Sequence, residues 1–151
     1  MRRLLLAVAL LLVACAQDDP TLGQPEDGQP TDAPATEGFV VTAVEYEFQA
    51  VPEALASGEH TFTLQNAGEE PHELYLAYIT SDQSIEEILE LPERQVNKVT
   101  QAVDRVEAAP GGSAEFTADL VPGRFGYVCF VQAPDGTPHA FLGMAGELTV
   151  A

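Results

Sequence analysis

The stretch CFVQAPDGTPHAFLGM, residues 129–144, leads from one strand-like segment to the last one in the chain and decides how the sequence is interpreted. It contains a thiol at Cys129, an imidazole at His139 and a thioether at Met144, and all three groups bind soft or borderline metal ions. A single long loop at one end of a β-sandwich can wrap three such donors around a point. One position is then left for a donor from elsewhere in the chain, and His72 is the candidate.

This donor set favours copper. Thiolate and thioether are soft and imidazole is borderline, and two histidines with one cysteine and a distant methionine form the geometry of electron-transfer copper sites. Zinc sites rarely include methionine. Because these ligands are intermediate between those that Cu(I) and Cu(II) prefer, little rearrangement accompanies a change of charge, and electron transfer is fast.

Each of these residues also has a more ordinary explanation. A histidine at the start of a strand is usually a surface residue, a methionine usually fills the core, and a single cysteine is usually a buried apolar side chain. After removal of an N-terminal leader, however, the chain has one methionine, one thiol besides Cys15 and three histidines, nearly all in this loop or in the turn before His72. Because nearly all of these few residues lie together, a metal site is favoured over the ordinary explanations. The remaining histidine, His60, lies in a strand-like segment, and we assign it no role.

Alternating segments rich in β-branched and aromatic residues predict strands in the rest of the domain. They lie at residues 39–48, 60–65, 72–79, 113–120, 124–131 and 146–150. Turn signals follow or precede several of them, at residues 66–68, 110–112 and 122–123. Many short strands with Gly/Pro turns predict an all-β fold and favour a β-sandwich.

One short helix is expected in an excursion between strands, over residues 84–93. Ser84 and Glu87 form a capping-box pattern, and three apolar residues lie at helical spacing beside them. Four valines between residues 94 and 108 also repeat at helical spacing, although valine favours strands. The sequence leaves the structure of this second segment open.

The strand-loop-strand pattern that carries Cys129, His139 and Met144 resembles the cupredoxins, the type 1 blue copper proteins. Two further segments carry the same resemblance. NAGEEPH, residues 66–72, resembles the turn that delivers the first histidine, and PGRFGYVC, residues 122–129, resembles the strand that delivers the cysteine.

The resemblance implies a plastocyanin-like Greek-key β-sandwich over residues 38–151 that binds one type 1 copper ion. The ligands that it implies are His72, Cys129, His139 and Met144. Four residues separate His139 from Met144 and nine separate Cys129 from His139, so the loop is nearest the type found in nitrite reductase copper domains.

The neighbours of the ligands raise further expectations. Many cupredoxins have an asparagine after the first histidine that braces the cysteine loop, and here that residue is Glu73. Tyr127 has the strand parity of Cys129 and is expected to pack on the same face. Phe141 and Leu142 are expected to shield the metal.

The chain opens with MRRLLLAVALLLVAC, which has two arginines, an apolar run and a small residue before Cys15. This pattern predicts a signal peptide over residues 1–14. Its end, LVAC, resembles a bacterial lipobox, which implies a lipoprotein that is membrane-anchored through lipid on Cys15. The alternative is an ordinary signal peptide with an incidental cysteine. In both cases the protein is exported to the cell envelope, in the periplasm or on the outer surface. The apolar run is only about half of the ~20 residues of a membrane-spanning helix.

Residues 15–37 are expected to form a disordered tether, because the sequence there is acidic, rich in proline and almost without large apolar residues. Loss of the two leader arginines leaves 4 basic residues against 24 acidic ones, a formal charge of −20. Such a surface repels nucleic acid and anionic lipid and favours a basic protein partner or cations, although the charge could also serve solubility alone. We expect a monomer.

The expected function is single-electron transfer between redox protein partners outside the cytoplasm. An enzyme is not expected, because the copper enzymes of this superfamily need a second copper centre with several more histidines, and only His60 remains. Two alternatives stay open: a protein that stores or delivers copper, and a metal-free interaction module. The closed donor set favours the electron carrier, since a delivery protein needs an exposed, exchangeable site.

Overall fold

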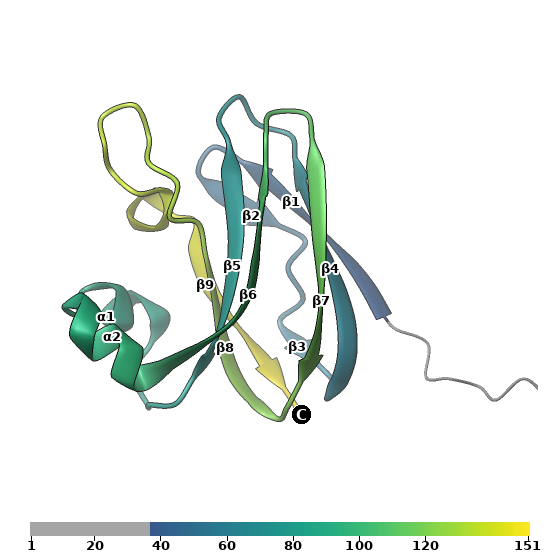
Figure 1. Ribbon diagram of the computed structural model, residues 1–151, viewed down its shortest axis with the longest axis vertical. Coiled ribbons are helices and arrows are strands. Elements are labelled where there is room, and N and C mark those ends of the chain that lie inside the picture. Colours follow the sequence, from purple (N-terminus) through teal and green to yellow (C-terminus); the bar gives the residue numbers. More distant parts are fainter. Residues whose placement is uncertain (1–36) are drawn as a thin grey trace, which may run out of the picture. The chain divides into compact units, whose positions relative to one another are not determined.

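The computed structural model describes residues 37–151, which form two β-sheets packed face to face (Figure 1). The first sheet has the order β2-β1-β4-β7 and the second has the order β3-β9-β8-β5-β6. The first consists of β1 (Glu37–Val44), β2 (Glu47–Gln49), β4 (Gly58–Asn66) and β7 (Ser113–Leu120). The second consists of β3 (Ala54–Leu55), β5 (His72–Ile79), β6 (Thr100–Ala108), β8 (Gly123–Val128) and β9 (Ala145–Val150). The predicted all-β sandwich is confirmed.

The predicted signal peptide, Cys15 and all of the predicted tether except Glu37 lie outside the described residues. Glu37 itself opens β1, so the first strand begins one residue before the expected domain boundary. Within residues 37–151, no helix is long and apolar enough to cross a membrane.

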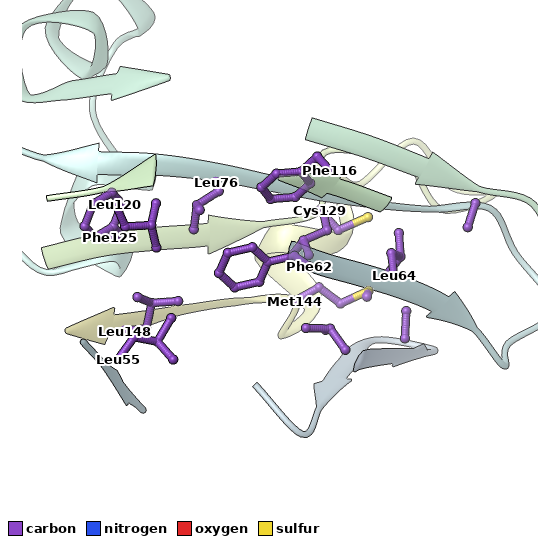
Figure 2. Packing of buried hydrophobic residues seen from close by; sticks show 14 of the residues in the cluster. Leu55, Phe62, Leu64, Leu76, Phe116, Leu120, Phe125, Cys129, Met144 and Leu148 are labelled. Atoms are coloured by element: carbon purple, nitrogen blue, oxygen red, sulfur yellow. The ribbon is translucent and has the colours of Figure 1, made fainter. Parts of the chain in front are cut away.

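The core lies between the sheets because alternate side chains of each strand point inward. In β4, His60, Phe62, Leu64 and Asn66 are buried while the residues between them are partly or fully exposed. Phe62 pairs with Phe116 of β7, and their rings stack with centroids 5.2 Å apart. Figure 2 shows these rings beside aliphatic residues of the opposite sheet and the sulfur atoms of Cys129 and Met144.

Two short helices cover part of the outer face of the second sheet: α1 (Ile85–Leu89) and α2 (Glu93–Val99). The capping box at the start of α1 is present as predicted, with Ser84 and Glu87 each accepting a hydrogen bond from the other's backbone N–H. The helix buries Ile85 and Ile88. The second helix, α2, lies in the segment whose structure the sequence left open.

The rest of that segment is strand β6, and a β-bulge explains why its two valines, Val103 and Val106, lie three residues apart. Leu76 pairs with Asp104 and Ala77 with Ala102, so Val103 is an extra residue opposite β5. A bulge shifts the alternation of side chains by one position. Both Val103 and Val106 therefore pack against the core.

Four connections gather at one end of the sandwich, which we call the loop end: residues 45–46, 67–71, 109–112 and 129–144. β1 and β4 are parallel and both finish there, and β5 begins there. β8 finishes and β9 begins at the same end, since Tyr75 near the start of β5 pairs with Val128 and Val128 pairs with Ala145. All of the predicted copper ligands belong to this end.

Candidate metal centre

Three of the four predicted ligands converge at the loop end. His72 is the first residue of β5, Cys129 follows β8 directly, and His139 opens a 3-10 helix, η1 (His139–Leu142). Their donor atoms all lie within 4.8 Å of one another, and all three residues are 0% exposed. The two histidine Nδ1 atoms are 3.2 Å apart, and Nδ1 of His139 lies 3.5 Å from Sγ of Cys129.

Met144, the fourth predicted ligand, is also 0% exposed and belongs to the same buried cluster as Cys129 (Figure 2). Its backbone carbonyl accepts from the N–H of Cys129 at 3.0 Å, and its own N–H donates to the carbonyl of His139 at 3.0 Å. The preceding Gly143 has φ +127, and a Cβ there would lie 2.9 Å from the carbonyl oxygen of Tyr46. Only glycine fits this approach to Met144 without strain.

The long loop is cross-linked by its own backbone. The N–H of Ala140 donates to the carbonyl of Cys129 at 2.8 Å, and the N–H of His139 donates to the carbonyl of Val131 at 2.8 Å. At the tip, the Asp135 carboxylate accepts from the N–H of Thr137 at 2.9 Å, and this bond lowers the pKa of Asp135. The donors are therefore held in place by hydrogen bonds that do not involve a metal.

The chemistry of the converging atoms fits a cation. His139 Nε2 lies 2.9 Å from a carboxylate oxygen of Glu70, which assigns a proton to Nε2 and leaves a lone pair on Nδ1. Burial, and after it the neighbouring His139, lowers the pKa of His72. A second proton on this imidazole is thus disfavoured. The Nδ1 atoms of the two histidines and Sγ of Cys129 thus face one another at hydrogen-bonding distances, and a metal ion at this point would take the place of the protons that they share.

The Cys129 sulfur has a defined environment as well. Burial raises the pKa of its thiol, and the backbone N–H of Glu73 opposes this by donating to Sγ at 3.3 Å. Burial disfavours the charged thiolate because water cannot solvate it, and a bound metal ion would stabilise the thiolate by its positive charge.

Glu73 also braces the cysteine loop, although it replaces the asparagine of many cupredoxins. Its carboxylate accepts from the N–H of Phe130, the residue after Cys129, at 3.3 Å. The Arg105 guanidinium lies 3.6 Å from the other carboxylate oxygen. Glu73 therefore links the strand of the first histidine to the loop of the cysteine.

Asn66 organises the turn before His72 and was not singled out as a site residue by sequence. It is 1% exposed, and its amide donates to the carbonyls of Glu70 at 2.7 Å and Ala108 at 2.9 Å, while its oxygen accepts from the N–H of Gly68 at 2.9 Å. The Asn-Ala-Gly pattern that predicted a turn here was the available signal.

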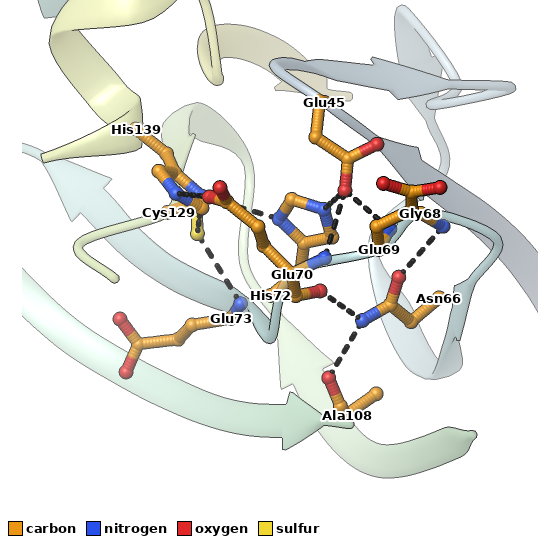
Figure 3. Close-up of polar contacts among 10 residues, drawn as sticks. All are labelled: Glu45, Asn66, Gly68, Glu69, Glu70, His72, Glu73, Ala108, Cys129 and His139. Carbon is orange, nitrogen blue, oxygen red and sulfur yellow. Dashed lines mark hydrogen bonds and ion pairs between the residues drawn. The ribbon is translucent and has the colours of Figure 1, made fainter. Parts of the chain in front are cut away.

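Two carboxylates, also missed by sequence reasoning, lie beside the histidines (Figure 3). Glu45 lies 3.5 Å from Nε2 of His72, and Glu70 is the partner of Nε2 of His139. Within a chain of 24 acidic residues, no local pattern distinguishes these two.

Aromatic and apolar residues surround the donors to different degrees. Phe141 and Leu142 are 56% and 40% exposed, and their expected role in shielding the metal stays a prediction. Tyr46 contacts His139 edge to face, with ring centroids 4.9 Å apart. Tyr127 is partly buried against the core, as expected, and meets Phe48 edge to face.

His60, to which we gave no role, is buried in β4 and lies outside the donor cluster. Its Nε2 is 2.7 Å from the carbonyl oxygen of Ala56.

The fold is that of the cupredoxins, and the donor cluster fits one copper ion of the type 1 kind.

Comparison with known proteins agrees with this fold. The structure is similar to that of reduced auracyanin from the photosynthetic bacterium Roseiflexus castenholzii, with a TM-score of 0.56 and 20% identity over 78% of this chain and 98% of the other. It is also similar to auracyanin A, described as a blue copper protein, from Chloroflexus aurantiacus, with a TM-score of 0.53 and 16% identity over 76% of this chain and 99% of the other. No protein-family model and no curated protein sequence matches the chain.

Proposed function

We propose that this protein binds one copper ion and transfers single electrons between redox protein partners outside the cytoplasm. The ligands are His72, Cys129, His139 and Met144. Bound copper supplies a reversible one-electron change between Cu(I) and Cu(II), and the protein residues hold the ligands in one geometry and exclude water. The proposed ligand loop between Cys129 and His139 is of the nitrite reductase type.

The observation that carries this proposal is the complete burial of all four side chains, three of which belong to a loop that is braced by its own backbone. A closed site with two imidazoles, a thiolate and a thioether retains copper in both oxidation states and leaves no position for a substrate. These features support an electron carrier over an enzyme. They also favour it over a delivery protein, which must expose its metal to a recipient.

The proposal includes the place of action. A signal peptide over residues 1–14 exports the chain, and a lipid on Cys15 anchors it to the membrane. Residues 15–36 tether a monomeric domain in the cell envelope that begins at Glu37, the first residue of β1. Replacing Cys15 with serine should abolish lipid labelling of the expressed protein, whereas labelling that persists would contradict the anchor.

The test of the copper site is spectroscopic. The purified protein is loaded with one equivalent of Cu(II), its visible and electron paramagnetic resonance spectra are recorded, and ascorbate is then added. We expect an intense band near the red end of the spectrum, a narrow copper hyperfine pattern and reversible bleaching. A colourless protein, or one with ordinary weak copper bands, would overturn the proposal and favour copper delivery or a metal-free module.

Cys129→Ser is the matched variant, because the intense colour requires the thiolate. It should lose the band and keep the fold, as judged by the circular dichroism of the strands. A Cys129→Ser protein that is equally blue would disprove the ligand assignment.

A further inference from the structure

Both copper-facing histidines have a carboxylate beside the ring nitrogen that points away from the metal position. Glu70 lies 2.9 Å from Nε2 of His139, and Glu45 lies 3.5 Å from Nε2 of His72. Both imidazoles are completely buried, whereas the carboxylate side chains are 23% and 31% exposed. Figure 3 shows the two pairs, with Cys129 next to His139.

The Glu45 carboxylate is fixed by the turn that carries the first histidine. One of its oxygens accepts from the backbone N–H of Glu69 at 2.5 Å and from that of Glu70 at 2.9 Å. A Cβ at Gly68 would collide with this carboxylate, so glycine is required for its approach. The hydrogen bond from the N–H of Glu70 is also the main cause of the lowered pKa of Glu45.

Glu70 joins the two halves of the site. It belongs to the turn between β4 and β5, two residues before His72, but its side chain reaches His139 on the other loop. Its backbone is held at both polar groups, because its N–H donates to Glu45 and its carbonyl accepts from Asn66. The backbone of Glu70 is therefore fixed, and its carboxylate is held at His139 by the hydrogen bond to Nε2.

A carboxylate at this position changes the donor strength of the opposite nitrogen. A histidine that donates Nε2–H to a carboxylate is a more basic ligand at Nδ1. The negative charge also interacts more favourably with Cu(II) than with Cu(I), and burial of the imidazole reduces the screening of this interaction by water.

We propose that Glu70 and Glu45 are positioning residues that stabilise the oxidised state of the bound copper and so lower its reduction potential. This inference rests on the proposed copper site. Glu70 has the larger effect, because it forms a direct hydrogen bond, whereas the Glu45 oxygen is shared with two backbone N–H groups and lies farther from its histidine.

The test compares reduction potentials of the copper-loaded full chain and its Glu70→Gln, Glu45→Gln and Glu69→Gln variants. Glutamine keeps the shape and removes the charge. Glu69 is the matched control, because it is exposed and occupies the same turn. Glu70→Gln should weaken Cu(II) relative to Cu(I) about tenfold, the lower end for such outer partners, which raises the potential by about 59 mV. Glu45→Gln should give a smaller rise, and Glu69→Gln should stay within about twofold of the wild type.

The outcomes separate the two proposals. A wild-type protein without a type 1 spectrum overturns the copper site itself. Blue variants in which Glu70→Gln and Glu69→Gln have the same potential overturn the inference and leave the copper site intact. If Glu70→Gln loses the blue spectrum, the Glu45→Gln variant decides the test. Its reduction potential must then be higher than that of Glu69→Gln. Equal potentials in these two variants overturn the inference.

Discussion

The turn before His72 depends on one buried amide, that of Asn66. Its three hydrogen bonds reach Gly68, Glu70 and Ala108, so it joins the turn to β6. Removing the amide leaves two carbonyls and one N–H without partners, and each such loss costs roughly 1 kcal/mol or more. We predict that Asn66→Ala destabilises the domain by about 3 kcal/mol in urea unfolding and weakens copper binding, because His72 loses its support.

Gln65→Ala is the control for this prediction. Gln65 precedes Asn66 in the same strand but is exposed, and substitutions at such positions stay within about 0.5 kcal/mol. Equal unfolding midpoints for the two variants would show that the Asn66 hydrogen bonds do not stabilise the turn.

The candidate site shows which residues a sequence can identify. Cys129, His139 and Met144 stand out because thiols, imidazoles and thioethers are rare in this chain. Glu45 and Glu70 do not, because their role follows from a turn that brings β1 and the two loops together, and nothing local marks them among many other acids. A residue type identifies a site residue in this sequence only where that type is rare.

At the level of secondary structure, α1 is fastened to the sheet by an ion pair. Arg124 of β8 and Glu147 of β9 form a bond of 2.7 Å, and Arg124 also donates to the carbonyls of Ser81 and Gln83. Glu147 in turn accepts from the N–H of Ile85, the first residue of α1, at 2.7 Å. The pair therefore fixes the segment that leads into the helix.

We predict that Arg124→Ala loosens this segment. Two carbonyls and the Glu147 carboxylate lose their partner, so stability should fall by about 1–2 kcal/mol, and amide hydrogen exchange in residues 81–89 should accelerate while that of β4 changes less. Arg94→Ala, an exposed arginine in α2, should leave exchange unchanged. Protection in residues 81–89 that is the same in both variants would contradict the anchoring role.

The helices and strands also differ in how well the sequence predicts them. The capping box of α1 is a local signal between Ser84 and Glu87, and the helix begins where it indicates. The sequence does not decide the structure of β6, because the bulge at Val103 replaces the two-residue period of a strand with a spacing of three residues, which is close to that of a helix. The pairing with β5 that creates the bulge is a long-range contact, and local periodicity does not report it.

For the whole molecule, charge should govern electron exchange. Residues 37–151 contain 19 acidic and 4 basic residues, a formal charge of −15. The attraction of cations to this surface weakens as the Debye length falls from about 30 Å at 0.01 M salt to about 10 Å at 0.1 M. We predict that a cationic cobalt complex oxidises the reduced protein about tenfold more slowly at the higher salt concentration.

An anionic oxidant, ferricyanide, is the control, and its rate should rise with salt. A rate that responds equally to salt with both reagents would show that the surface charge does not steer encounters. It would also remove the reason to expect a basic protein partner.

The direction in which the first strand runs orients the whole domain. β1 starts at Glu37 beside His60 and ends beside Asn66 at the loop end, so the chain enters the sandwich at the pole farthest from the proposed copper (Figure 1). Eight residues of strand span roughly 25 Å. An attachment through the residues before Glu37 would therefore join the domain at the end opposite the loop end. The loop end, with the proposed copper, would then be the end of the domain that is free to meet a partner.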